Sequence, residues 1–314
     1  MRMLFMLGTL ALAGSLAARP AAAGALDTIH ARHQLTCGAL TVPDDYSKDW
    51  THGNLRALAI DYCQALAVAA LGPQGKAKLI GYPLRRQGLV ALRAGKIQVL
   101  IGETPNPADA ALYHVAYGPT LFEDGQGFLV PKALGIHAIE DFSGKQICYI
   151  AGTPADQNLI AAFEPRHIAY LPFPFEEVGE MEAALVTGHC AAITADRSAL
   201  AVMRSGFHAR IRDFAVLDQT ITAEPVAPVY AKGDRPWAAL VDGTVNTLAE
   251  AERLGVTEEG YAATATSTDP AIKQLRRAPG AAAIAKVGNR GEIFARDLGD
   301  RSPLGLERQA SLAP

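Results

Sequence analysis

Segments with the hydrophobic patterns of strands and helices alternate along this chain, and this alternation constrains its fold more than any other feature. In the first run, LTCGAL, AKLIGY and IQVLIG read as strands, and LAIDYCQALAVAALG and RRQGLVALRAG read as the helices between them. Gly72 and Gly95 are typical residues at which such helices end. The pattern predicts a mostly parallel sheet covered by helices, with ligand loops at the carboxyl ends of the strands.

A second run repeats this alternation with KQICYIAG, HIAYLPF and CAAITA as strands and TPADQNLIAAF and FEEVGEMEAALVTG as helices. We expect Thr153 to cap the first of these helices, with Pro154 at its first position. In each run a carboxylate, Glu103 or Asp196, lies eight residues after the glycine that ends a helix, Gly95 or Gly188. This weak internal repeat predicts two similar lobes that face each other, each with an acidic residue at the end of a strand.

Two extended segments rich in Gly or Pro, residues 122–132 and 222–233, flank the second run and are expected to be hinge strands. They divide the chain into a first lobe of residues 26–126 and 229–314 and a second lobe of residues 127–228. Residues 237–255 and 283–299 each predict one amphipathic helix. The last segment, residues 302–314, is expected to be a loosely attached end.

The N-terminal segment has the pattern of a cleaved secretory signal, which we place at residues 1–25. Arg2 precedes an apolar run over residues 3–18, and small residues follow before Leu26. The run is short of the ~20 apolar residues that a membrane anchor needs. We therefore expect an exported protein.

The four cysteines, Cys37, Cys63, Cys148 and Cys190, are an even number, which in an exported protein suggests two disulfides. Three pairings are possible. The order of strands and helices favours Cys37 with Cys63 and Cys148 with Cys190, because each bond then closes a loop within one run. No CxxC or HExxH spacing is present, so we predict no metal site and no cofactor.

The charge of the chain restricts its partners. The formal net charge is −3, and no basic cluster goes beyond Arg85 and Arg86. This composition argues against nucleic acid and anionic lipid as partners.

Longer stretches resemble a known family over nearly the whole chain that follows the signal, in the same order. These stretches are LTCGAL, IDYCQALA, EDGQGFLVPK, ICYIAGT, TGHCAAITADRSAL, TAEPVAPVYAKGD, EAERLGVT and VGNRGEIFARDLGDRSPLG. The chain is similar to the periplasmic amino-acid-binding proteins of ABC importers, most closely to the general L-amino-acid-binding group, and its cysteines fall where that group has its two disulfides.

The resemblance implies an α/β, bilobal periplasmic-binding-protein fold, with two mostly parallel sheets, flanking helices and two hinge strands. It implies a periplasmic protein whose lobes close on a solute before it docks on a membrane permease. We expect this solute to be small and polar, an amino acid or amine, and the protein to be a monomer without enzymatic activity.

Matching the family's site residue by residue gives a mixed result. Asp196, in ITADRS, matches the aspartate that binds the ligand's ammonium group, and Thr153, in AGTPAD, matches the hydroxyl at a helix start. The first lobe differs from the family pattern in the loop ETPNPADA. This loop keeps Thr104, but it has a small residue near Ala110 where the family has the arginine that binds the ligand's carboxylate. An unpaired buried carboxylate costs several kcal/mol.

Two hypotheses address the missing arginine. In the first hypothesis, Glu103 and Asp196 face each other across the cleft and select an amine or diamine. Its alternative is that Glu103 points into solvent or pairs with Arg197.

In the second hypothesis, Arg85 or Arg86 replaces the arginine that binds the ligand's carboxylate. Its alternative is that the two arginines only form a solvated basic face of their helix. The predicted ligand contacts are thus Glu103, Thr104, Thr153, Asp196 and Arg85.

Two other function classes stay open. The same fold hosts periplasmic dehydratases, in which a cleft carboxylate such as Glu103 or Asp196 acts as general acid or base. A ligand-free accessory or sensor protein is the second. No Ser/His/Asp or Cys/His constellation is readable in the sequence.

Overall fold

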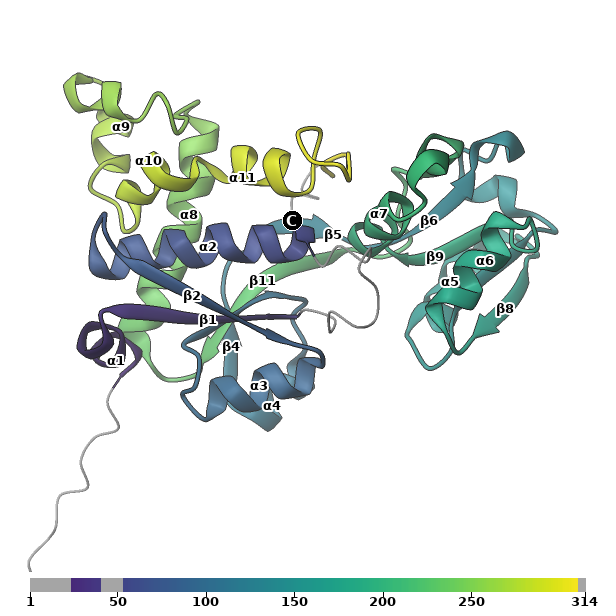
Figure 1. Cartoon of the computed structure of the whole chain (residues 1–314), viewed down its shortest axis with the longest axis horizontal. Coiled ribbons are helices and arrows are strands. Elements are labelled where there is room, and N and C mark those ends of the chain that lie inside the picture. The colour runs from purple at the N-terminus through teal and green to yellow at the C-terminus, as the bar shows by residue number, and fades with distance from the viewer. Residues whose placement is uncertain (1–23, 41–52, 310–314) are drawn as a thin grey trace, which may run out of the picture.

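The computed structural model describes residues 24–40 and 53–309, so the predicted signal segment lies outside the described residues except for its last two positions. None of the helices in these ranges combines the length and the apolar character that crossing a membrane requires. Strands gather in two separate sheets, and Figure 1 shows these sheets as the cores of two bodies joined by extended strands.

The first sheet has the order β2-β1-β3-β11-β4, and β5 also pairs with β11. Parallel pairing joins β1 to β2 and β3, whereas β11 runs antiparallel to its neighbours. Its strands are β1 (Gln34–Leu40), β2 (Lys76–Tyr82), β3 (Val99–Glu103), β4 (Val115–Tyr117), β5 (Phe122–Asp124) and β11 (Glu224–Ala231). The helices of this lobe are α1 (Ala25–Arg32), α2 (Gly53–Leu71), α3 (Arg85–Arg93), α4 (Pro107–Tyr113), α8 (Arg235–Arg253), α9 (Pro270–Leu275), α10 (Ile284–Val287) and α11 (Arg290–Asp297).

The second sheet has the order β10-β6-β9-β7-β8. Its strand β7 is parallel to β8 and β9, and β6 is antiparallel to β9 and β10. The strands are β6 (Gln126–Pro131), β7 (Gln146–Ile150), β8 (Leu171–Phe175), β9 (Ala192–Asp196) and β10 (Phe214–Val216), and the helices are α5 (Ala155–Phe163), α6 (Val178–Val186) and α7 (Arg197–Ser205). Both sheets are thus mixed, with parallel pairing in the run of alternating strands and helices.

Short 3-10 helices also occur along the chain. They are η1 (Lys132–Leu134), η2 (Ile139–Phe142), η3 (Glu164–Arg166), η4 (His208–Asp213), η5 (Ala262–Thr266) and η6 (Ala281–Ala283).

The chain crosses between the lobes at Gly125 and again between β10 and β11. A Cβ atom on Gly125 would lie 2.3 Å from the carbonyl oxygen of Thr222, so only glycine lets the two crossings approach this closely. The Gln126 amide donates to the Thr222 hydroxyl (2.7 Å), and the Ile221 amide donates to the Gln126 carbonyl (2.8 Å). The expected lobe limit at 228/229 falls inside β11, which pairs with strands of the first sheet.

Each lobe has a buried core and one disulfide. In the first lobe Trp237 is fully buried, and its indole donates to the Gln98 carbonyl (2.8 Å); in the second, Phe128, Phe142 and Phe163 pack together. The disulfides join Cys37 to Cys63 and Cys148 to Cys190, which ties β1 to α2 and β7 to the turn before β9. Neither bond spans the hinge.

Two expectations for the C-terminal region were wrong. The single helix expected over residues 283–299 is two helices, α10 and α11, because Gly288 takes a left-handed conformation (φ 79°) and the Asn289 side chain caps the next helix by accepting from the Glu292 amide. Residues 302–309 of the last segment are also not loose, since Leu304 and Leu306 are buried, and residues 310–314 lie outside the described residues.

Candidate ligand-binding site

In the first lobe, β3 ends at Glu103, whose side chain is buried beside Arg85 at the start of α3. The Arg85 Nε lies 3.4 Å from a Glu103 carboxylate oxygen and 2.8 Å from a carboxylate oxygen of Asp109. One Arg85 Nη donates to the Thr104 carbonyl (2.9 Å) and to the Tyr117 hydroxyl (3.1 Å). One guanidinium is therefore held between two carboxylates.

Burial dominates the electrostatics of Glu103. Removal from water and the nearby Asp109 carboxylate raise the pKa of Glu103 to about 7, and the Arg85 charge opposes them. Within the described residues, the Glu103 Oε1 is buried without a hydrogen-bond partner. At neutral pH this carboxyl therefore titrates, and when both acids are ionised the cluster carries net negative charge.

These contacts decide between several expectations from the sequence. Glu103 neither points into solvent nor pairs with Arg197, which bonds instead to Asp218 (3.3 Å). Arg85 lies beside Glu103 and Thr104, and its charge is offset by the carboxylates of Glu103 and Asp109. Arg86 is exposed on the helix surface.

Sequence reasoning missed Asp109 and Tyr117. The signal for Asp109 was present in NPADA, because Asn106 caps α4 through bonds from the Ala108 and Asp109 amides and Pro107 occupies the first helical position. No local sequence pattern predicts the contact of Tyr117 with Arg85, because only the folded sheet brings β4 close to Arg85.

In the second lobe, a pocket of about 340 Å³ lies between the end of β9 and the start of α5. Its apolar wall comes largely from α6 and α7, and its polar rim holds Asp196 and Thr153. The lining residues are Gln126, Ile150, Thr153, Pro154, Ala155, Asn158, Val178, Met181, Thr194, Ala195, Asp196, Ala199, Met203 and Glu224. Apart from Glu224 at the hinge end of β11, all of these described residues belong to the second lobe, so one lobe supplies nearly the whole described lining of this pocket.

Thr153 lies at the pocket but does not cap the helix as expected. The helix begins at Ala155 with Pro154 in the cap position, and the Thr153 hydroxyl donates to the Ile150 carbonyl (2.7 Å). The hydroxyl oxygen still accepts a long bond from the Ala155 amide (3.4 Å). The early turn through Pro154 therefore moves the expected cap by one residue.

A network of amides and a hydroxyl forms the polar base of the pocket, and it was not foreseen. The Gln126 side chain donates to the Thr194 hydroxyl (3.0 Å) and to the Ala155 carbonyl (3.2 Å), and it accepts from the Asn158 side chain (2.9 Å). The Thr194 hydroxyl in turn donates to the Gly127 carbonyl (2.7 Å). These bonds fix the wall beside Asp196 and link it to the hinge strand β6.

Asp196 is exposed at the pocket. The protein around it removes much of its hydration, and the charges of Asp124 and Glu224 add repulsion, so the pKa of Asp196 is raised to about 7. Both charged groups that act on it are acids, and no cationic side chain pairs with it among the residues at 24–40 and 53–309. The pocket therefore presents a carboxylate that is stabilised by any cation entering it. In the same ranges, His, Cys, Asp and Glu form no cluster able to hold a metal ion.

Comparisons with known proteins identify the family. No family model matches the chain. The chain is 31% identical to the general L-amino acid-binding periplasmic protein AapJ of Rhizobium johnstonii, over 93% of this chain and 89% of that protein. It is also 31% identical to the glutamate/glutamine/aspartate/asparagine-binding protein BztA of Rhodobacter capsulatus, over 96% and 93%.

A solved structure agrees with these relatives. It is a periplasmic binding protein of an ABC transporter from Brucella ovis with glutathione bound, 30% identical to this chain. It superposes with a TM-score of 0.70 and covers 91% of this chain and 94% of that one. The bilobal α/β fold and the resemblance found in the sequence are thus confirmed, and the chain belongs to the family of periplasmic solute-binding proteins of amino-acid ABC transporters.

Proposed function

We propose that the protein captures a small solute bearing an ammonium group between its lobes and delivers it, unaltered, to the permease of an ABC importer. The observation that carries the proposal is the Asp196 carboxylate, which lies in the second-lobe pocket without a cationic partner among the described residues. An ammonium group bonded to this carboxylate gains a charge-assisted hydrogen bond.

The relatives support this choice of solute. AapJ is named for L-amino acids, BztA for glutamate, glutamine, aspartate and asparagine, and the Brucella ovis structure holds glutathione. Every one of these molecules carries an ammonium group at neutral pH, so an acceptor for that group is what they would share with the solute of this chain.

The first lobe supports a narrower choice. Arg85 already lies against Glu103 and Asp109, so the described part of this cluster offers no uncompensated positive charge to a ligand carboxylate. We expect neutral and cationic solutes to bind more tightly than dicarboxylates such as aspartate and glutamate. A diamine, whose second ammonium group would meet the acidic cluster of Glu103 and Asp109 after closure, is the extreme form of this preference.

The test is a calorimetric titration of refolded mature protein with glutamine, lysine, glutamate, putrescine and glutathione. Asp196→Asn should weaken the tightest solute by about 10- to 100-fold, because a hydrogen bond to a charged group contributes about 1.5–3 kcal/mol. Asp213→Asn, which changes an exposed acid of the same lobe outside the pocket, is the matched control. Equal affinity of the Asp196→Asn variant and the wild type would rule the proposal out.

The remaining expectations join the proposal. We propose a monomer without catalytic activity, whose lobes move about Gly125 and the segment between β10 and β11. The solute should be recovered chemically unchanged after prolonged incubation, as mass spectrometry of the released ligand would show. Conversion to a product would favour the dehydratase alternative, in which Glu103 or Asp196 transfers a proton.

A further inference from the structure

The C-terminal tail, which we define as residues 300–309, leaves α11 of the first lobe and packs on α7 of the second. Leu304 and Leu306 are buried in one apolar cluster with Ala201 and Val202 of α7. In Figure 1 this end of the chain lies between α11 and α7. The tail is therefore a third connection between the lobes, additional to the two hinge crossings.

Polar bonds fasten the tail to the second lobe at four points. Arg204 donates to the Leu304 carbonyl, and Arg197 donates to the Glu307 carbonyl (3.1 Å). The Gln309 side chain donates to the Asp218 carbonyl (3.0 Å) and to the Thr220 hydroxyl (3.3 Å). These bonds were not foreseen from the sequence, because most of them use backbone carbonyl groups.

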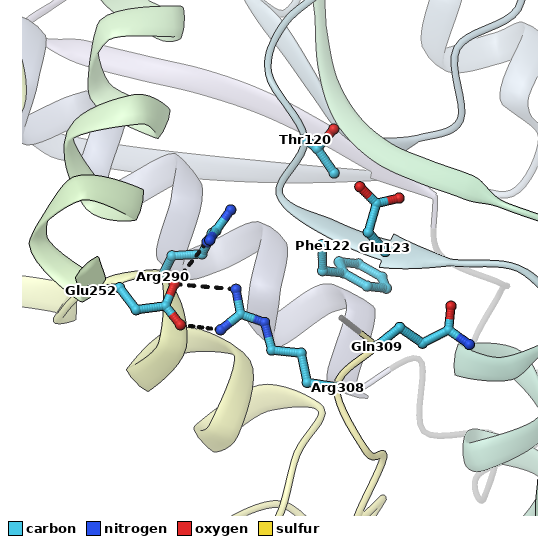
Figure 2. A pocket seen from close by; sticks show the side chains of 7 residues that line it. All are labelled: Thr120, Phe122, Glu123, Glu252, Arg290, Arg308 and Gln309. Atoms are coloured by element: carbon cyan, nitrogen blue, oxygen red, sulfur yellow. Dashed lines mark hydrogen bonds and ion pairs between the residues drawn. The ribbon is translucent and has the colours of Figure 1, made fainter. Parts of the chain in front are cut away.

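Other bonds fasten the same tail to the first lobe. The Leu306 amide donates to the Leu298 carbonyl (2.9 Å), and the Arg308 guanidinium pairs with the Glu252 carboxylate of α8. Figure 2 shows Arg308 and Arg290 converging on Glu252 beside a pocket of about 430 Å³, whose opposite wall holds Phe122 and Glu123 of β5. The tail and β5, the strand that leads into the first hinge crossing, thus line the same pocket.

Arg197 joins the tail to the ligand pocket. It follows Asp196 directly in the chain, its side chain is 2% exposed, and its backbone amide donates to the Gly125 carbonyl in the hinge (3.0 Å). The Arg197 Nε, Nη1 and Nη2 bond to the Leu217 carbonyl, the Glu307 carbonyl and Asp218. A movement of the tail away from Arg197 therefore leaves a buried donor without a partner.

We propose that residues 300–309 act as a strap that holds the lobes open and so sets how readily they close. The proposal rests on the proposed function, in which the lobes close on a solute. Arg197 and Arg204 are seven residues apart on α7, a separation of about 10 Å along the axis. When α7 rotates about the hinge, the tail cannot keep both of these bonds and its bonds to Leu298 and Glu252. Closure must therefore break some of them.

The test measures lobe separation without any ligand. Spin labels on unnatural amino acids at two exposed positions, Leu112 of α4 and Ile160 of α5, report the distance between the lobes by pulsed electron resonance. Arg308→Ala combined with Gln309→Ala removes side-chain bonds on both lobes. In this variant we expect a shorter mean distance and at least a threefold rise in the share of short distances.

Two further variants make the outcome decisive. Arg253→Ala also removes a cation paired with a glutamate of α8, but this pair lies within one helix and joins no second element, so the distances should match those of the wild type. A chain ending at Pro303, whose folding circular dichroism checks, also loses the bonds of Leu304, Leu306 and Glu307 and should show the larger shift. Unchanged distances in both the double variant and the folded, shortened chain would overturn the strap, whereas failure of every solute to bind would overturn only the proposed function.

Discussion

At the scale of single residues, Glu103 links stability to pH. Its pKa is raised to about 7, above the value of about 4.3 in an unfolded chain, so the folded protein favours the protonated form. The contribution of Glu103 to the free energy of unfolding is therefore largest below the unfolded pKa and is lost as pH rises through about 7. Glu103→Gln should stabilise the ligand-free protein by roughly 1–3 kcal/mol at pH 8, and the gain should be clearly smaller at pH 5, because the difference is lost as pH falls towards the unfolded pKa.

Urea unfolding at pH 5 and pH 8 measures this effect. Glu140→Gln, at an exposed glutamate of η2, is the control and should change little at either pH. A Glu103→Gln protein that is less stable than the wild type at pH 8 would show that the ion pair with Arg85 outweighs the cost of burial.

The raised pKa of Asp196 predicts that solute affinity depends on pH. An ammonium ligand needs the ionised carboxylate, and the pKa of this group is raised to about 7. Affinity should therefore rise about tenfold between pH 6 and pH 8, as the ionised fraction grows. Titration calorimetry at both pH values measures the rise, and Asp196→Asn should remove it; a flat profile in the wild type would contradict the assignment.

The same residues show how far the sequence can be read. The positions of Glu103 and Asp196 at strand ends were predicted because each follows a regular apolar pattern, and the end of such a pattern is visible in the local sequence. The Arg85 contacts with Asp109 and Tyr117 could not be found, because they depend on how α3, α4 and β4 meet in space. No local pattern records such a meeting.

At the scale of elements, the break between α10 and α11 yields a prediction. Gly288 has φ 79°, and a Cβ atom there would lie 2.8 Å from the Glu292 carboxylate. Gly288→Ala should therefore lower the free energy of unfolding by about 1–3 kcal/mol. Gly179→Ala in α6, where φ is ordinary and nothing lies within 4 Å, should be neutral or stabilising in the same thermal denaturation. Equal losses in the two variants would contradict this account.

The helices and strands were predicted correctly where the hydrophobic period ends at the same residue as a glycine. They were predicted wrongly where the period continues past a glycine. The strands and helices of both alternating runs were located correctly to within a few residues. In the C-terminal region the apolar period continues through Gly288, so the period alone joined two helices into one. The buried tail was missed because two leucines spaced by Gly305 carry no period at all.

At the scale of the whole molecule, Gly125 controls how the hinge crossings meet. Gly125→Ala should push Thr222 away and displace the start of β6, where Gln126 pairs with Asp196. We expect at least tenfold weaker solute binding with the two lobes still folded, as calorimetry and circular dichroism would report. Unaltered affinity would mean that the crossings can separate without disturbing the pocket.

The disulfides have a consequence for maturation of the protein. Each bond joins cysteines that are neighbours in the order of the chain, first Cys37 with Cys63 and then Cys148 with Cys190. A chain that is exported N-terminus first exposes its thiols in this same order, so oxidising them as they emerge produces the native bonds. Thiol oxidation then suffices, and the slow reshuffling that non-consecutive pairings require is avoided. We therefore expect the yield of active protein to depend on a periplasmic thiol oxidant and to be insensitive to loss of disulfide isomerase.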